Sequence, residues 1–154
     1  MDRVHPDEAV EAQVEEVVGQ EIGVTEWVPI TQKRVNAFAD ATGDHQWIHV
    51  DPARAADGPY GTTIAHGYLT LSLLPVLGAE ILDIRGFSMM INYGLEKVRF
   101  PAAVPVGSRI RAGIELTSLQ RKASGIQLNS VMTVEIEGGD RPALVAETVR
   151  LMVE

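Results

Sequence analysis

The chain has 154 residues, 45% of them hydrophobic and 22% charged, a balance typical of one globular domain with a buried core. It contains no cysteine, which excludes disulfides, thiolate nucleophiles and cysteine-ligated metal sites. The formal net charge of −8 argues against nucleic acid as a partner. Residues 1–21 hold seven acidic side chains and one basic one, so the rest of the chain is nearly neutral and can accept an anionic substrate.

No apolar run reaches the roughly 18 residues that a membrane span requires. The first residues, MDRVHPDEAVEA, have neither a basic start nor an apolar stretch, so no signal peptide is expected. We therefore expect a cytoplasmic protein without a membrane span.

The N-terminal residues 1–20 are predicted to form an acidic amphipathic helix. Pro6 and the two acids after it suit a first helical turn. Valines then recur on one helical face up to about Val18: Val10, Val14 and Val17. A strand is predicted over residues 22–30, where short apolar stretches partly alternate with polar residues.

A second helix is predicted from Thr31, whose hydroxyl can cap the first turn, to near Gly43. Residues 43–63 are rich in glycine and proline and predict an irregular segment, with one helical turn at about residues 52–56. Residues 64–82 are leucine-rich and predict a helix that is buried nearly all round. Pro75 should kink this helix or lie where a backbone hydrogen bond is already missing.

From Phe87 onward the pattern changes to strands. Residues 109–117 and 126–136 alternate between apolar and polar side chains, and a last strand is predicted over residues 144–153. An antiparallel sheet with one buried face must curl around the apolar helix, which predicts a single α+β domain over residues 1–154. Its long edge strand would be unpaired in a monomer, so we expect a homodimer formed by sheet extension.

The titratable side chains gather in and beside the irregular segment, which holds His45 and His49 and is followed by His66. One interpretation is purely structural: Thr42-Gly43-Asp44 ends a helix, and the histidines are ordinary surface or core residues. A second is a metal site, because His45 and His49 are four residues apart. It is disfavoured because HExxH is absent and because glycine and proline flank the pair.

A third interpretation is an acid–base pair, Asp44 and His49, that holds one water molecule. Hydration of a double bond conjugated to a thioester needs a base, an acid and stabilisation of the enolate-like oxygen. Aspartate and histidine can supply the first two. Backbone N–H groups of His66 and Gly67, at the start of the apolar helix, can supply the third.

The order of these residues resembles the MaoC-like (R)-specific enoyl-CoA hydratases. The resemblance lies in ADATGDHQWIHVDPARA (residues 39–55), IAHGYLTLSLL (residues 64–74) and YGLEKVRFPAAVPVGSRI (residues 93–110). It implies a dimeric hot-dog fold without metal or redox cofactor, which hydrates trans-2-enoyl-CoA to (R)-3-hydroxyacyl-CoA. It further implies that Asp44 and His49 are catalytic and that Gly67 binds the thioester oxygen.

Two departures from the family pattern concern the pocket. The family commonly has Asn-Pro where this chain has Gln46 and Trp47, and a pocket serine where this chain has Pro75, with Ser72 the nearest hydroxyl. Neither change removes the chemistry.

Other candidates have ordinary explanations beside the functional ones. Four basic side chains can meet CoA phosphates or simply be solvated: Lys97, Arg99, Arg109 and Arg111. Four aromatic side chains can line an acyl tunnel or only pack: Trp47, Tyr60, Phe87 and Tyr93. Asp51 is expected to cap the turn at Pro52.

Two other functions remain open, a hot-dog acyl-CoA thioesterase and a non-catalytic acyl-CoA-binding module. The pairing of Asp44 with His49 favours hydration, since a binding module needs no acid–base couple.

Overall fold

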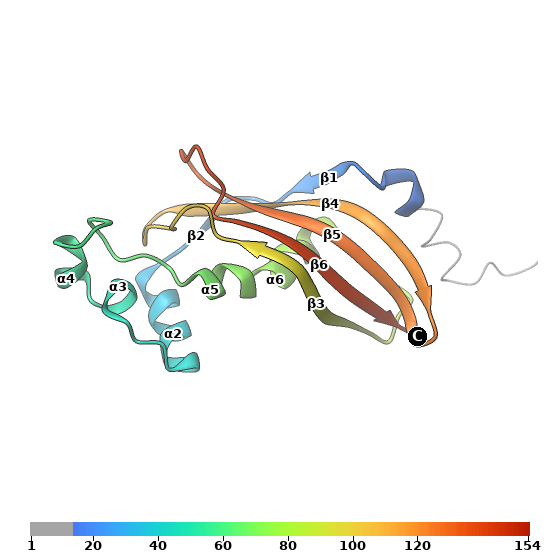
Figure 1. The fold of residues 1–154 in the computed structure, drawn as a ribbon, viewed down its shortest axis with the longest axis horizontal. Coiled ribbons are helices and arrows are strands. Elements are labelled where there is room, and N and C mark those ends of the chain that lie inside the picture. Colours follow the sequence, from blue (N-terminus) through green and yellow to red (C-terminus); the bar gives the residue numbers. More distant parts are fainter. Residues whose placement is uncertain (1–13) are drawn as a thin grey trace, which may run out of the picture.

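The computed structural model describes residues 14–154, in which one antiparallel sheet curves over a central helical segment (Figure 1). Of the predicted N-terminal helix, residues 14–17 are helical, and residues 1–13 lie outside the described part. The elements, in chain order, are β1 (Glu21–Val24), β2 (Val28–Pro29), α2 (Gln32–Thr42), α3 (Trp47–Val50), α4 (Pro52–Ala56), α5 (Gly67–Ser72), α6 (Leu74–Ile81), β3 (Met89–Arg99), β4 (Arg109–Lys122), β5 (Gly125–Ile136) and β6 (Leu144–Val153).

The sheet has the strand order β1-β4-β5-β6-β3, and β2 also pairs with β4. The long strands bury alternate side chains, as their period-2 pattern predicts, because successive side chains point to opposite faces. The buried face of β4 and β5 holds Ile110, Ala112, Ile114, Leu116, Ile126, Leu128, Met132 and Val134. The α+β prediction is therefore confirmed.

The strand predicted over residues 22–30 is two short strands, β1 and β2, separated by residues 25–27, where Thr25 still bonds Ala112 of β4. The next helix, α2, matches its prediction closely. Thr31 caps it by accepting a hydrogen bond from the Arg34 N–H at 3.2 Å. It ends at Gly43, whose φ of 84° only glycine adopts easily and whose N–H donates to the Ala39 carbonyl at 2.8 Å.

The apolar segment 64–82 forms two helices, α5 and α6, which meet at Leu73. Pro75 lies in the first turn of α6, where its missing N–H costs little. The prediction of burial nearly all round is wrong, because Tyr68 is 70% exposed and Val76 is 60% exposed. The sheet covers only one side of this segment, so only that side is buried.

The core lies between the concave face of the sheet and this covered side, where Leu69, Leu74 and Leu77 pack against β4 and β5 residues. Fully burying one such side chain stabilises a fold by about 1.5–3 kcal/mol. Between residues 14 and 154, no helix combines the length and apolarity needed to cross a membrane.

Candidate active site

The irregular segment is more helical than its composition suggests. The sequence predicted α4, which Asp51 caps by accepting from the Arg54 N–H at 3.1 Å, as expected. It did not predict α3, a single turn closed by the His49 N–H donating to the Gln46 carbonyl at 3.0 Å. The α3 turn carries His49 and begins three residues after Asp44, so it brings the side chains of Asp44 and His49 together.

Asp44 follows directly on the left-handed turn at Gly43. Its N–H donates to the Thr42 hydroxyl at 3.4 Å, and its carboxylate accepts from the Gln46 N–H at 3.4 Å. The side chain is 53% exposed. The residues that end α2 therefore also hold this carboxylate in place, so the structural and functional interpretations of Thr42-Gly43-Asp44 are compatible.

His49 is buried, with 7% of its surface exposed. Its Nδ1 lies 2.7 Å from the Ile64 carbonyl oxygen. A carbonyl can only accept, so Nδ1 carries the proton and Nε2 is left as a proton acceptor. Burial lowers the pKa of His49, assisted by neighbouring His66 and opposed by the bond to Ile64 and by Asp44. The neutral imidazole is thus the favoured form.

His66 is the residue that precedes α5, and its ring is 3% exposed. It stacks on the His49 ring with the centroids 3.8 Å apart, and its Nε2–H donates to the Asp44 backbone carbonyl at 3.0 Å. Its Nδ1 is buried without a hydrogen-bond partner among residues 14–154. The side chain of His66 therefore links the two predicted catalytic residues, a role that the sequence did not indicate.

A carboxylate oxygen of Asp44 and one ring nitrogen each of His49 and His66 lie within 4.8 Å of one another. Such a donor set is able to bind a divalent metal ion. Two of the four ring nitrogens already donate to backbone carbonyls, which leaves His49 Nε2 and His66 Nδ1 as the proton acceptors of the cluster. His45 lies apart from this cluster, because its Nε2 bonds the Asp40 carboxylate at 2.8 Å on the surface.

A cavity of about 610 Å³ adjoins His49 and is lined by Tyr60, Gly67, Phe100 and Arg141, among others. Gly67 is the first residue of α5, so its N–H has no acceptor within the helix. A Cβ at Gly67 would lie 3.1 Å from the Phe100 ring. Glycine here keeps a backbone donor open in the cavity that His49 lines.

The other candidates from the sequence are dispersed. Arg109 and Arg111 pair with Glu137 and Glu135 on the outer face of the sheet, which agrees with the solvated alternative. Of the aromatic candidates, Tyr60 lines the cavity. The others lie elsewhere: Trp47 packs against Arg54, Phe87 packs against the core, and Tyr93 is exposed on β3. Ser72 donates to the Tyr68 carbonyl at 2.6 Å.

Sequence reasoning missed Gln32, which connects α2 to the segment that carries the site. Its side-chain amide donates to the His49 carbonyl at 2.8 Å and accepts from the Thr63 hydroxyl at 2.6 Å. Nothing in the sequence distinguishes this glutamine from an ordinary first-turn residue of a helix. Arg141 was missed as well, because it lies in the turn between β5 and β6, far from the motif in sequence.

Comparison with known proteins places the chain in one family. Residues 13–137 match the family model described as MaoC like domain. The chain is 55% identical to 3-hydroxyacyl-thioester dehydratase Z of Mycobacterium tuberculosis over 90% of this chain and 92% of that protein. It is 46% identical to nodulation protein N of Rhizobium leguminosarum bv. viciae, with coverages of 92% and 89%.

Among solved structures, the (R)-hydratase from A. caviae involved in PHA biosynthesis superposes with a TM-score of 0.72. The two chains are 29% identical, with 88% of this chain and 96% of that one covered. The sequence and the fold comparisons agree. The chain therefore belongs to the MaoC-like dehydratase family, as a hydro-lyase with the hot-dog fold.

Proposed function

We propose that the protein reversibly hydrates trans-2-enoyl-CoA thioesters to (R)-3-hydroxyacyl-CoA, with Asp44 and His49 acting on one water molecule. The observation that carries the proposal is the pairing of the Asp44 carboxylate with His49, whose Nδ1–H is committed to the Ile64 carbonyl. Two polar atoms up to 4.8 Å apart can share a single bridging water. The names of the dehydratase relative and of the (R)-hydratase support the substrate class.

The steps follow from the protonation states. His49 Nε2 accepts a proton from the water while Asp44 holds its second O–H, and the water oxygen bonds to C3 of the enoyl chain. The electron pair of the double bond moves to the thioester oxygen, where the Gly67 N–H stabilises the negative charge. The pair then delivers the proton to C2 from the same face, which gives syn addition. The chain supplies every group in this sequence, so no metal or redox cofactor is required.

The substrate and the assembly are part of the same proposal. Arg141 beside the cavity is a candidate contact for the CoA phosphates, as are Lys97 and Arg99 near the end of β3. We propose a cytoplasmic homodimer that pairs through β3, an edge strand of the sheet.

The direct test is the absorbance of a conjugated enoyl-CoA together with a thiol assay. We expect loss of the enone band without release of thiol, and formation of the (R) alcohol by chiral chromatography. Thiol release would indicate a thioesterase, and binding without turnover would indicate a binding module.

A further inference from the structure

Arg150 is a buried cation without a counter-ion among residues 14–154. It lies on β6 and is 7% exposed, and its guanidinium donates to the sulfur atoms of Met90 and Met132, at 3.7 and 3.6 Å. Sulfur is a weak acceptor, and an arginine has five N–H donors. Among residues 14–154, no carboxylate forms an ion pair with it. Burying an unpaired charge is costly, so the site lacks an anion that would offset the cost.

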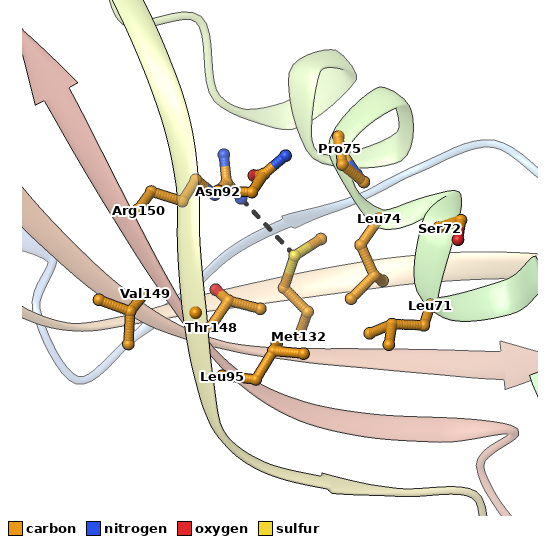
Figure 2. Close-up of a pocket in the computed structure, with 11 residues that line it drawn as sticks. Leu71, Ser72, Leu74, Pro75, Asn92, Leu95, Met132, Thr148, Val149 and Arg150 are labelled. Carbon is orange, nitrogen blue, oxygen red and sulfur yellow. Dashed lines mark hydrogen bonds between the residues drawn. The ribbon is translucent and has the colours of Figure 1, made fainter. Parts of the chain in front are cut away.

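The guanidinium lines a cavity of about 230 Å³ between α5–α6 and the strands β3, β5 and β6 (Figure 2). Most of the lining is apolar, including Leu71, Leu74 and Leu95. Figure 2 shows the Arg150 head group beside Asn92, with Leu74 and Pro75 of α6 on the facing side. The volume has room for several water molecules at ~30 Å³ each, and thus for a small anionic group with part of an alkyl chain.

Two neighbours adapt this cavity to the guanidinium. Asn92 lies directly opposite Arg150 in the β3–β6 register, and its side-chain amide adds donors beside the arginine. Gly78 of α6 makes room, because a Cβ there would lie 3.1 Å from Arg150 Nη2. A nearby acid, Asp83, lines the adjoining cavity, but its carboxylate pairs with Arg85 at 2.7 Å.

One face of α5–α6 extends from the proposed catalytic pair to Arg150. Gly67, Leu71, Leu74 and Gly78 follow one another at intervals of three or four residues, so they lie on one side of α5–α6. Leu73, which joins α5 to α6, has a right-handed helical conformation, so α6 continues in the direction of α5. Eleven residues at 1.5 Å each place Arg150 about 16 Å from the Gly67 donor along the helix, a span suited to an extended acyl chain.

We propose that Arg150 and Asn92 bind a carboxylate at the far end of the acyl chain, so that the preferred substrates are CoA thioesters of dicarboxylic acids. The inference rests on the proposed function. A carboxylate matches the planar guanidinium and supplies the missing charge, whereas the apolar walls accept the methylenes before it.

The test compares two 2-enoyl-CoA series of equal chain length, one ending in a methyl group and one in a carboxylate. We expect the wild-type protein to have the higher kcat/KM for the carboxylate-ended series at the length that reaches Arg150. In Arg150→Met, the ratio of the two kcat/KM values should fall by ~30-fold or more, the usual consequence of removing one partner of a buried charge pair. Arg150→Lys should restore part of the preference, and Asp83→Asn, the matched control, should retain it.

Equal use of both series by the wild-type protein would overturn the inference, as would an equal loss for both in Arg150→Met. If that variant does not fold, saturated thioesters of both kinds are compared as ligands of the wild-type protein by thermal shift. Tighter binding of the carboxylate-ended thioester supports the inference, and equal binding refutes it. This binding assay is independent of turnover, so it separates failure here from failure of the proposed hydration.

Discussion

The helical face of α5–α6 that carries Gly67 and Gly78 has buried side chains of opposite character at its two ends. Burial favours the neutral form of one group and encloses a permanent charge at the other end. At the first end, His49 and His66 are buried with one N–H each bonded to a backbone carbonyl, and burial favours the neutral ring of His49. At the other end, Arg150 is equally buried, and its guanidinium stays charged although burial lowers its pKa. A group that moves protons must change its charge easily, whereas a group that recognises an anion must keep its charge. Burial thus suits the proposed proton transfer at one end and the proposed binding of a carboxylate at the other.

The largest effect is expected at the catalytic end. Asp44→Asn removes the carboxylate that holds the water, and His49→Gln removes the proton acceptor, while both keep similar size and polarity, so each should lower kcat by ~10²–10⁴-fold. The double variant should be little worse than either single one, because groups that act on one water are not additive. Enone absorbance measures the rate, and circular dichroism checks the fold. A rate near that of the wild type in Asp44→Asn would contradict the assignment.

The next effect concerns stability at the other end. Arg150→Met replaces an unpaired buried cation by an apolar side chain among Met90, Met132 and Leu74. We expect the free energy of unfolding without ligand to rise by about 1–4 kcal/mol, as when buried ionic groups give way to apolar ones. Urea unfolding measures this change. A loss of stability would show that the guanidinium is already satisfied in the unliganded protein.

The pH dependence tests the state of His49. Its Nε2 must be unprotonated to accept from water, and burial holds its pKa below the ordinary value of about 6.5. We therefore expect kcat/KM to stay constant from neutral pH down to below about pH 6.5 and then to fall tenfold per unit. The unfolded chain takes up this proton more readily than the folded one, so acidification also lowers stability. An activity midpoint above the ordinary histidine value would contradict a buried neutral base.

The proposed dimer would make the Arg150 end of the molecule less exposed than the end that carries His49. The edge strand β3 carries Asn92 of the Arg150 cavity and exposes Met89, Ile91, Tyr93 and Leu95. Pairing with a second copy would shield this end from water. Light scattering should give about 33 kDa, twice the 16.7 kDa chain. Tyr93→Lys should shift the protein toward monomer, and a stable active monomer of the wild type would contradict the proposed assembly.

The smallest effect is expected at His45. This side chain lies on the surface beside Asp40, away from the cluster of Asp44, His49 and His66. His45→Gln should therefore change kcat less than twofold, on the order of ordinary surface substitutions. Loss of activity in this variant, reproduced by chelator treatment of the wild-type protein, would favour a metal site that includes His45.

Much of the fold was predictable because local rules decided it. The period-2 pattern of residues 109–117 and 126–136 matches the buried face, since the alternation of side chains is a property of the strand itself. Thr31 and Gly43 mark the ends of α2 through bonds within one turn. Asp44, His49 and Gly67 were identified from the family motif. Their mutual geometry was not, because it depends on α3, a turn too short to have a sequence pattern.

Arg150 had a signal in the sequence that was not used. It shares its strand face with Leu144, Ala146 and Met152, all buried, so alternation alone would have placed it inward. Because an arginine in a strand is usually expected to face solvent, the alternation of buried and exposed side chains did not predict the burial of Arg150.

By itself the sequence determined the alternating strands β4 and β5 and the caps of α2 and α4, because each depends on neighbours within a few residues. Only the tertiary structure decided the break at Leu73, the exposure of Tyr68 and Val76, the stacking of His66 on His49, and the absence of a counter-ion for Arg150 among residues 14–154. Each of these depends on which surfaces the sheet covers when it closes over α5 and α6. That closure is set by contacts between segments far apart in the chain, for which local sequence has no pattern.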